Sequence, residues 1–188
     1  MEFEIICGSP AKQPAGCVVA GVFEEGKLSA AAELLDSAAK KFLTGIVRRG
    51  DMNGKAGASL LLHGVPGIAA ERVLLVGLGK QREFGAKEYR TAVGAAVRRL
   101  GDAGAKDAAL YLTELSVGKR DVAWNVRQAT LAAQDALYRF DKLKSKKEEQ
   151  RRRLAKLCFA VARRTDKAAA EAALAEGVAI AAGMELAR

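Results

Sequence analysis

Residues 72–84, RVLLVGLGKQREF, decide the fold, because an apolar strand there runs into a glycine turn followed by a lysine. Such a turn either cradles a phosphate or simply ends a strand. A dinucleotide-binding GxGxxG needs a third glycine where Arg82 stands, and the P-loop pattern GxxxxGK(S/T) is absent. We therefore interpret Gly77 and Gly79 as residues that let the backbone turn with positive φ where the strand leaves the sheet.

Further strands and helices alternate on both sides of this stretch. A short turn, GVPG at residues 64–67, joins the preceding strand to it and predicts a hairpin. Apolar runs and apolar–polar alternation predict strands over 2–7, 17–23, 57–63, 72–78, 107–115 and 157–162. Apolar residues recurring every three or four positions predict helices over 28–48, 86–100, 122–140 and 166–188. This order predicts a three-layer α/β domain with a mixed sheet.

Helix boundaries follow from glycines and capping residues. Gly45 is expected to break or bend the helix over 28–48. Asp121 and Asp166 are expected to cap the two helices that follow them. The last helix carries an expected apolar face, made of Leu174, Val178, Ala181, Ala182 and Leu186.

Composition bounds the class of protein. The chain has 188 residues, half of them hydrophobic, which suffices for a hydrophobic core that does not depend on disulfides or bound metals. No apolar run approaches the ~20 residues of a membrane span, and the N-terminus lacks a signal-peptide pattern. Cys7, Cys17 and Cys158 lie in apolar runs, which predicts buried, reduced thiols. These features predict a cytoplasmic protein without a membrane partner.

The net charge of +9 is concentrated in one stretch, residues 142–156. This segment, KLKSKKEEQRRRLAK, supplies six of the nine excess positive charges. One interpretation is a solvent-exposed segment that connects two elements. The other is a surface that contacts the phosphates of a nucleic acid and does not recognise its bases. The residues that would make that contact are Lys142, Lys144, Lys146, Lys147, Arg151, Arg152 and Arg153.

The sequence offers no catalytic constellation of its own. The lone His63 ends a strand, without cysteine or carboxylate at metal-ligand spacing, so we interpret it as structural. The patterns HExxH and GxSxG are absent, and so are paired carboxylates. A third hypothesis is a nucleotide or ADP-ribose pocket, in which the glycine turns at 64–67 and 77–79 present N–H groups to a phosphate.

Several motifs, taken in order, resemble the N-terminal domain of the leucyl (cytosol) aminopeptidases. They are RVLLVGLGK, YRTAVGAAVRRL, AALYL, LAAQDALYRFDKLKSKK and the closing EGVAIAAGMELAR. The triplet at residues 138–140 followed by lysines is the most specific of them, and the resemblance covers essentially all of the chain. In the family the closing helix leads into RDLxNxPxN, and this sequence stops at Arg188, which opens that motif.

The resemblance implies a macrodomain-like fold over residues 1–165 and an interdomain helix over 166–188. It implies a parent hexamer, with N-terminal domains at the corners, that releases N-terminal residues from peptides. Two divalent metal ions, manganese or zinc, and all catalytic residues would lie in a further domain, so none is carried over to this chain. Some bacterial members bind DNA, which makes DNA a candidate partner. The implied role of this domain is in assembly and active-site access.

Overall fold

The computed structural model describes residues 1–143 and 154–187, and the side chains of 139–143 are not described. The strands are β1 (Glu2–Cys7), β2 (Val18–Val22), β3 (Ser59–His63), β4 (Arg72–Gly77), β5 (Asp107–Leu110) and β6 (Lys156–Val161). The α-helices are α1 (Ala30–Ala38), α2 (Phe42–Arg48), α3 (Ala86–Asp102), α4 (Val122–Leu143) and α5 (Lys167–Leu186). Short 3-10 helices are η1 (Gln81–Glu83), η2 (Tyr111–Glu114) and η4 (Arg164–Asp166).

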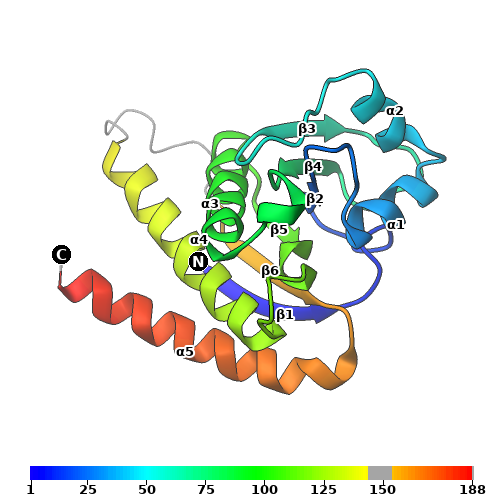
Figure 1. Cartoon of the computed structure of the whole chain (residues 1–188). Coiled ribbons are helices and arrows are strands. Elements are labelled where there is room, and N and C mark those ends of the chain that lie inside the picture. Colours follow the sequence, from blue (N-terminus) through cyan, green and yellow to red (C-terminus); the bar gives the residue numbers. More distant parts are fainter. Residues whose placement is uncertain (144–153, 188) are drawn as a thin grey trace.

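The six strands form one mixed sheet in the order β1-β6-β5-β2-β4-β3 (Figure 1). All neighbours are parallel except β3, which pairs antiparallel with β4 at one edge, as the expected hairpin requires. The β4 strand lies next to β2 and is buried along most of its length. Residues 72–77 therefore form a central strand, and the predicted α/β class with a mixed sheet is confirmed.

Helices cover both faces of the sheet. Alternate β4 residues divide between two cores: Leu74 and Val76 face α3 and α4, while Val73 and Leu75 face α1 and α2. This period-two division is what a strand buried on both sides must show. The α5 helix forms an outer addition that packs mainly against α4 (Figure 1).

The expected helix over 28–48 is two helices, and the prediction of the break at Gly45 is wrong. The chain turns at Lys40 and Lys41, which have φ of 51° and 67°, and Gly45 lies inside α2. The buried Asp36 carboxylate fixes this corner: it accepts hydrogen bonds from the Thr44 backbone N–H at 2.9 Å and the Thr44 hydroxyl at 2.6 Å. These bonds satisfy the Thr44 N–H in the first turn of α2 and hold the corner in place without a glycine.

Two further boundaries differ from expectation. The strand expected over 107–115 ends at Leu110 and continues as η2. Asp121 caps α4 as predicted, by accepting a 2.8 Å hydrogen bond from the Trp124 N–H. Asp166, in contrast, makes no side-chain cap on α5, because its carboxylate is paired with Arg163 at 2.9 Å.

The α5 helix packs through small residues rather than through the expected apolar face. Its buried positions are Ala170, Ala173, Gly177 and Ala181. Of the expected face, Ala181 is buried and Leu174 packs against the core, whereas Val178, Ala182 and Leu186 are exposed. Small side chains let α5 approach α4 closely, which larger ones at the same positions would prevent.

Candidate functional site

The glycine turn after β4 is a strand end and not a phosphate cradle. Its N–H groups are already used: Gly77 donates to the Ala58 carbonyl, Leu78 to that of Val22 and Gly79 to that of Gly54, at 2.7–2.9 Å. Gly79 has the expected positive φ of 78°, but Gly77 does not. Gly77 is required instead because a Cβ there would lie 1.9 Å from the Lys55 carbonyl oxygen.

The two glycine turns of the nucleotide hypothesis lie at opposite ends of the β4 strand. The turn at 64–67 joins the end of β3 to the start of β4, whereas the turn at 77–79 follows the end of β4. A six-residue strand separates them by about 20 Å. The two turns therefore lie at opposite ends of β4 and do not contact one phosphate together.

The basic stretch is only partly visible. Lys144, Lys146, Lys147, Arg151, Arg152 and Arg153 lie outside the described residues, and Lys142 belongs to α4 without a described side chain. Lys156, the last charge of the stretch, lies in β6 and is paired with Glu4 and Glu2. The side chains of the predicted nucleic-acid contact therefore lie outside the part of the chain that the structure describes.

A crevice lies where three parallel strands end, and the sequence did not point to it. Residues within 23–33, 81–84 and 111–118 line this cavity of about 520 Å³. We call it the switch-point crevice, because β2 and β5 are neighbours whose following helices lead to opposite sides of the sheet. Open α/β sheets bind ligands at such a point, outside the carboxyl ends of the strands.

Glu114 is the half-buried acid of the switch-point crevice. Burial raises the pKa of its carboxyl to about 7. Tyr111 beside it is 1% exposed, and burial together with the Glu114 charge raises the pKa of its phenol. Lys27, at the rim, donates a 3.2 Å hydrogen bond to Gln81. The crevice therefore combines apolar walls with an acid whose charge changes near neutral pH.

Replacing Glu114 by glutamine is expected to stabilise the fold above neutral pH. Unfolded glutamate ionises at its usual pKa of 4.5, but the folded chain keeps this proton until about pH 7. Stability therefore falls as pH rises through that window, and the variant should not show the fall. Allowing for partial exposure, we expect a gain of about 1–2 kcal/mol at pH 8. Urea unfolding at several pH values measures this gain. If the free energy of unfolding changed with pH in the same way in both proteins, the prediction would be contradicted.

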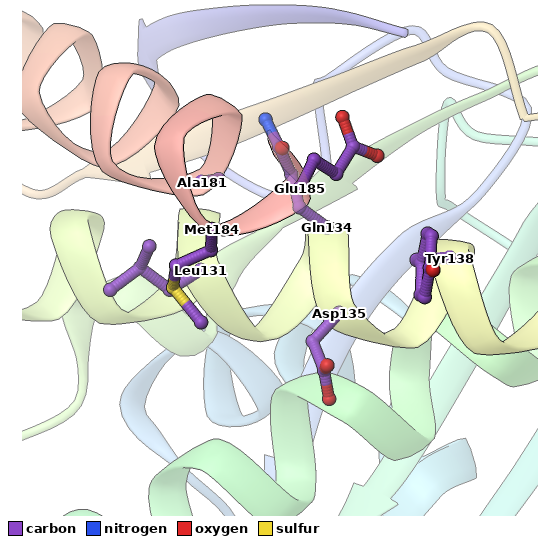
Figure 2. Close-up of a pocket in the computed structure, with 7 residues that line it drawn as sticks. All are labelled: Leu131, Gln134, Asp135, Tyr138, Ala181, Met184 and Glu185. Carbon is purple, nitrogen blue, oxygen red and sulfur yellow. The ribbon is translucent and has the colours of Figure 1, made fainter. Parts of the chain in front are cut away.

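The second feature of note is the C-terminal half of α5. Four of the large apolar side chains exposed on the described surface lie there: Val178, Ile180, Met184 and Leu186. Met184 continues the spacing of the buried small residues, yet it is 46% exposed. Figure 2 shows it beside Leu131 of α4, where the two helices border a small groove of about 20 Å³. The α4–α5 interface therefore opens toward this end.

The described part of the chain holds neither a metal cluster nor a membrane-spanning helix. Within 1–143 and 154–187, no three His, Cys, Asp or Glu side chains gather in a way that could hold a metal ion. His63 ends β3 at the surface, opposite Arg72. Across the same ranges, no helix has both the length and the apolar character needed to cross a bilayer.

Comparisons with known proteins agree with the fold. Residues 19–147 match the family described as "Cytosol aminopeptidase family, N-terminal domain". All 188 residues align, at 55% identity, with a probable cytosol aminopeptidase of Dechloromonas aromatica, of which they cover 38%. The chain therefore spans little more than a third of the length of such curated relatives.

Solved structures show the same architecture. A mutant of tomato leucine aminopeptidase matches 100% of this chain and 37% of its own, with a TM-score of 0.72 at 19% identity. A Trypanosoma brucei macrodomain in complex with ADP matches 92% of this chain and 69% of its own, with a TM-score of 0.64 at 14% identity. At these identities the likeness establishes a macrodomain-like fold and nothing about ligands.

Proposed function

Because the chain belongs to the cytosol aminopeptidase family and aligns with the N-terminal part of its members, we propose that it is the non-catalytic N-terminal domain of a metal-dependent aminopeptidase. The parent enzyme would release N-terminal amino acids from peptides in the cytoplasm. The domain's own role would be to support assembly, which we propose to be a homo-hexamer, and to limit access to the active sites.

The chemistry belongs, on this proposal, to the part of the parent that follows this domain. Two divalent ions, manganese or zinc, polarise a peptide carbonyl and activate a water in such sites, and they need several converging carboxylates. The described residues do not fit that requirement, because no three potential ligands gather among them. We therefore assign no catalytic step to this chain.

The observation that carries the domain assignment is the surface of α5. Its exposed apolar residues Ile180, Met184 and Leu186 cluster toward the C-terminal end of the helix. Such clustered exposure supports an interaction surface there. We propose that residues 1–165 are the α/β domain and that 166–188 form an interdomain helix, covered in the parent by its catalytic domain.

A peptidase assay tests this function. The 188-residue chain and a full-length relative are compared with a chromogenic leucine substrate in Mn²⁺ and in Zn²⁺. We expect turnover from the full-length protein alone. Metal-dependent release of the amino acid by the 188-residue chain would overturn the assignment, and so would an inactive full-length protein.

Self-association through α5 is a further expectation for the isolated chain. At high concentration its mass in sedimentation should exceed 19.9 kDa. Replacing Ile180 and Met184 by glutamate should restore the monomer, because it removes exposed apolar area. Replacing the exposed Ala175 and Ala179 by glutamate is the matched control. This control variant should still self-associate. A monodisperse wild-type monomer would contradict the expectation.

DNA binding is a second candidate function, favoured by the net charge of +9 and by the basic stretch at 142–156. Contacts to phosphates alone give affinity that falls steeply with salt and depends little on sequence. A gel shift titrated with salt tests this, with Lys144, Lys146 and Lys147 replaced by glutamine as the comparison. Absence of retardation by the wild type at low salt removes this function.

A further inference from the structure

The switch-point crevice has the size and the walls of a small-molecule site. Its volume of about 520 Å³ falls in the range of ligand pockets, roughly 300–1,000 Å³. Phe23 and Phe84 form one wall and meet edge to face, with ring centroids 5.6 Å apart. Leu28 and Leu115 add aliphatic surface. These walls suit a short apolar body.

Three polar side chains of the crevice, those of Tyr111, Ser29 and Lys27, are engaged within the protein. The Tyr111 hydroxyl donates to the Gly8 carbonyl at 3.0 Å. The Ser29 hydroxyl accepts from the Gly21 and Ala32 N–H groups, at 3.2 and 3.3 Å. Lys27 is engaged with Gln81. These groups hold the crevice in shape and leave little capacity for a ligand.

Within the described part of the chain, the half-buried Glu114 carboxylate is not engaged in this way, whereas Glu33 and Ser116 are exposed at the rim. Among the described residues its carboxylate makes no hydrogen bond or ion pair, although the group is half-buried. A desolvated carboxylate is stabilised by a cation that brings its own charge and N–H donors. The aromatic rings nearby favour a cation as well.

We propose that the switch-point crevice binds a primary ammonium ligand with a short apolar body, its ammonium on the Glu114 carboxylate and its body against Phe23, Phe84 and Leu28. The site is separate from the peptidase function proposed above and does not depend on it. A ligand of this class is an alkylamine or the amino end of a small apolar amino-acid derivative.

A matched series of ligands tests the charge requirement. The 188-residue chain is titrated in NMR with 3-methylbutylamine, with 3-methylbutanol and with 4-methylpentanoate, which share the apolar body and differ in charge. We expect saturable shifts for the amine, concentrated in residues 23–33 and 111–118. We expect at least tenfold weaker binding of the alcohol and the acid. Equal binding of all three, or shifts elsewhere, would overturn the proposal.

Variants test the role of Glu114. Glu114→Gln should weaken the amine at least tenfold, whereas Glu33→Gln, at the exposed rim of the same crevice, should change it less than twofold. The Glu114→Gln variant is expected to be at least as stable as the wild type, and its amide spectrum verifies folding. Unchanged affinity of a folded Glu114→Gln protein for the amine would refute the role of Glu114. The ligand series uses only the wild-type chain and therefore tests the charge requirement independently of this variant.

Proton linkage supplies a third readout. The amine must displace the proton of Glu114, so its affinity should rise roughly thirtyfold from pH 5.5 to 8.0, given a pKa of about 7. The other titratable groups that line the crevice are Lys27, Glu33 and Tyr111. ADP-ribose serves as the anionic probe. If ADP-ribose bound to the crevice more tightly than the amine does, the proposal would be overturned and the site would be assigned to phosphate-bearing ligands.

Discussion

The Gly77→Ala variant is expected to lose about 3 kcal/mol or more of folding free energy. The added Cβ would lie 1.9 Å from the Lys55 carbonyl oxygen and 2.8 Å from its carbon. Both partners are backbone, which cannot rotate away as a side chain can. Relief requires the segment before β3 to move away from the end of β4.

That movement would also break hydrogen bonds. Gly77 donates to the Ala58 carbonyl at 2.7 Å, and its own carbonyl accepts from the Gly57 N–H at 3.1 Å. Both bonds tie the start of the β3 edge to the central strand β4. Their loss adds to the steric cost, since each broken bond leaves groups near the core without partners.

Urea unfolding of the wild type, Gly77→Ala and Gly183→Ala measures this effect. Gly183 lies in α5, and a Cβ added there would meet no atom within 4 Å, so alanine should gain about 0.5–1 kcal/mol from helix propensity. The control thus shares the substitution and differs in its surroundings. A Gly77→Ala protein as stable as the wild type would refute the close packing of this turn.

Much of the fold follows from the sequence because local periodicity and the core agree. Apolar runs such as 72–77 are buried on both faces of a central strand, and the α3 stripe of Tyr89, Val93 and Val97 is fully buried. In these elements the residue spacing alone fixes which side chains face the sheet. The strand order could not be derived in the same way, because pairing depends on contacts between distant segments.

The features that sequence reasoning misses have identifiable physical reasons. The corner at Lys40 and Lys41 is set by the tertiary bonds of Asp36, not by the glycine that local propensity favours. The switch-point crevice escapes prediction because a single strand over 107–115 would place Glu114 in the sheet. A polar Thr113-Glu114 pair after an apolar run is the available signal for an early strand end.

The α5 helix needs a different criterion from hydrophobicity. Its expected face contains large residues, yet the contact with α4 is made by alanines and Gly177. The ion pair between Arg127 and Glu176, at 2.6 Å, joins the two helices beside that glycine. Close helix crossings select small side chains, so the stripe of smallest residues is the better predictor.

This crossing makes Gly177→Leu the second substitution with a large expected effect. A Cβ at Gly177 would lie 2.9 Å from the Thr130 Cβ and 3.3 Å from the Arg127 carbonyl oxygen. A leucine side chain cannot fit between the helices, so α5 must move away from α4 and lose its buried alanines. We expect a loss of about 2–3 kcal/mol.

The exposed Gly183 again provides the control, because leucine there meets open space. Gly183→Leu should leave stability unchanged or slightly raised, through helix propensity. Hydrogen exchange adds the location of the effect: in Gly177→Leu the amides of α5 should exchange faster, while those of β2 and β4 keep their protection relative to global unfolding. Equal stability of the two leucine variants would mean that α5 does not pack on α4 through Gly177.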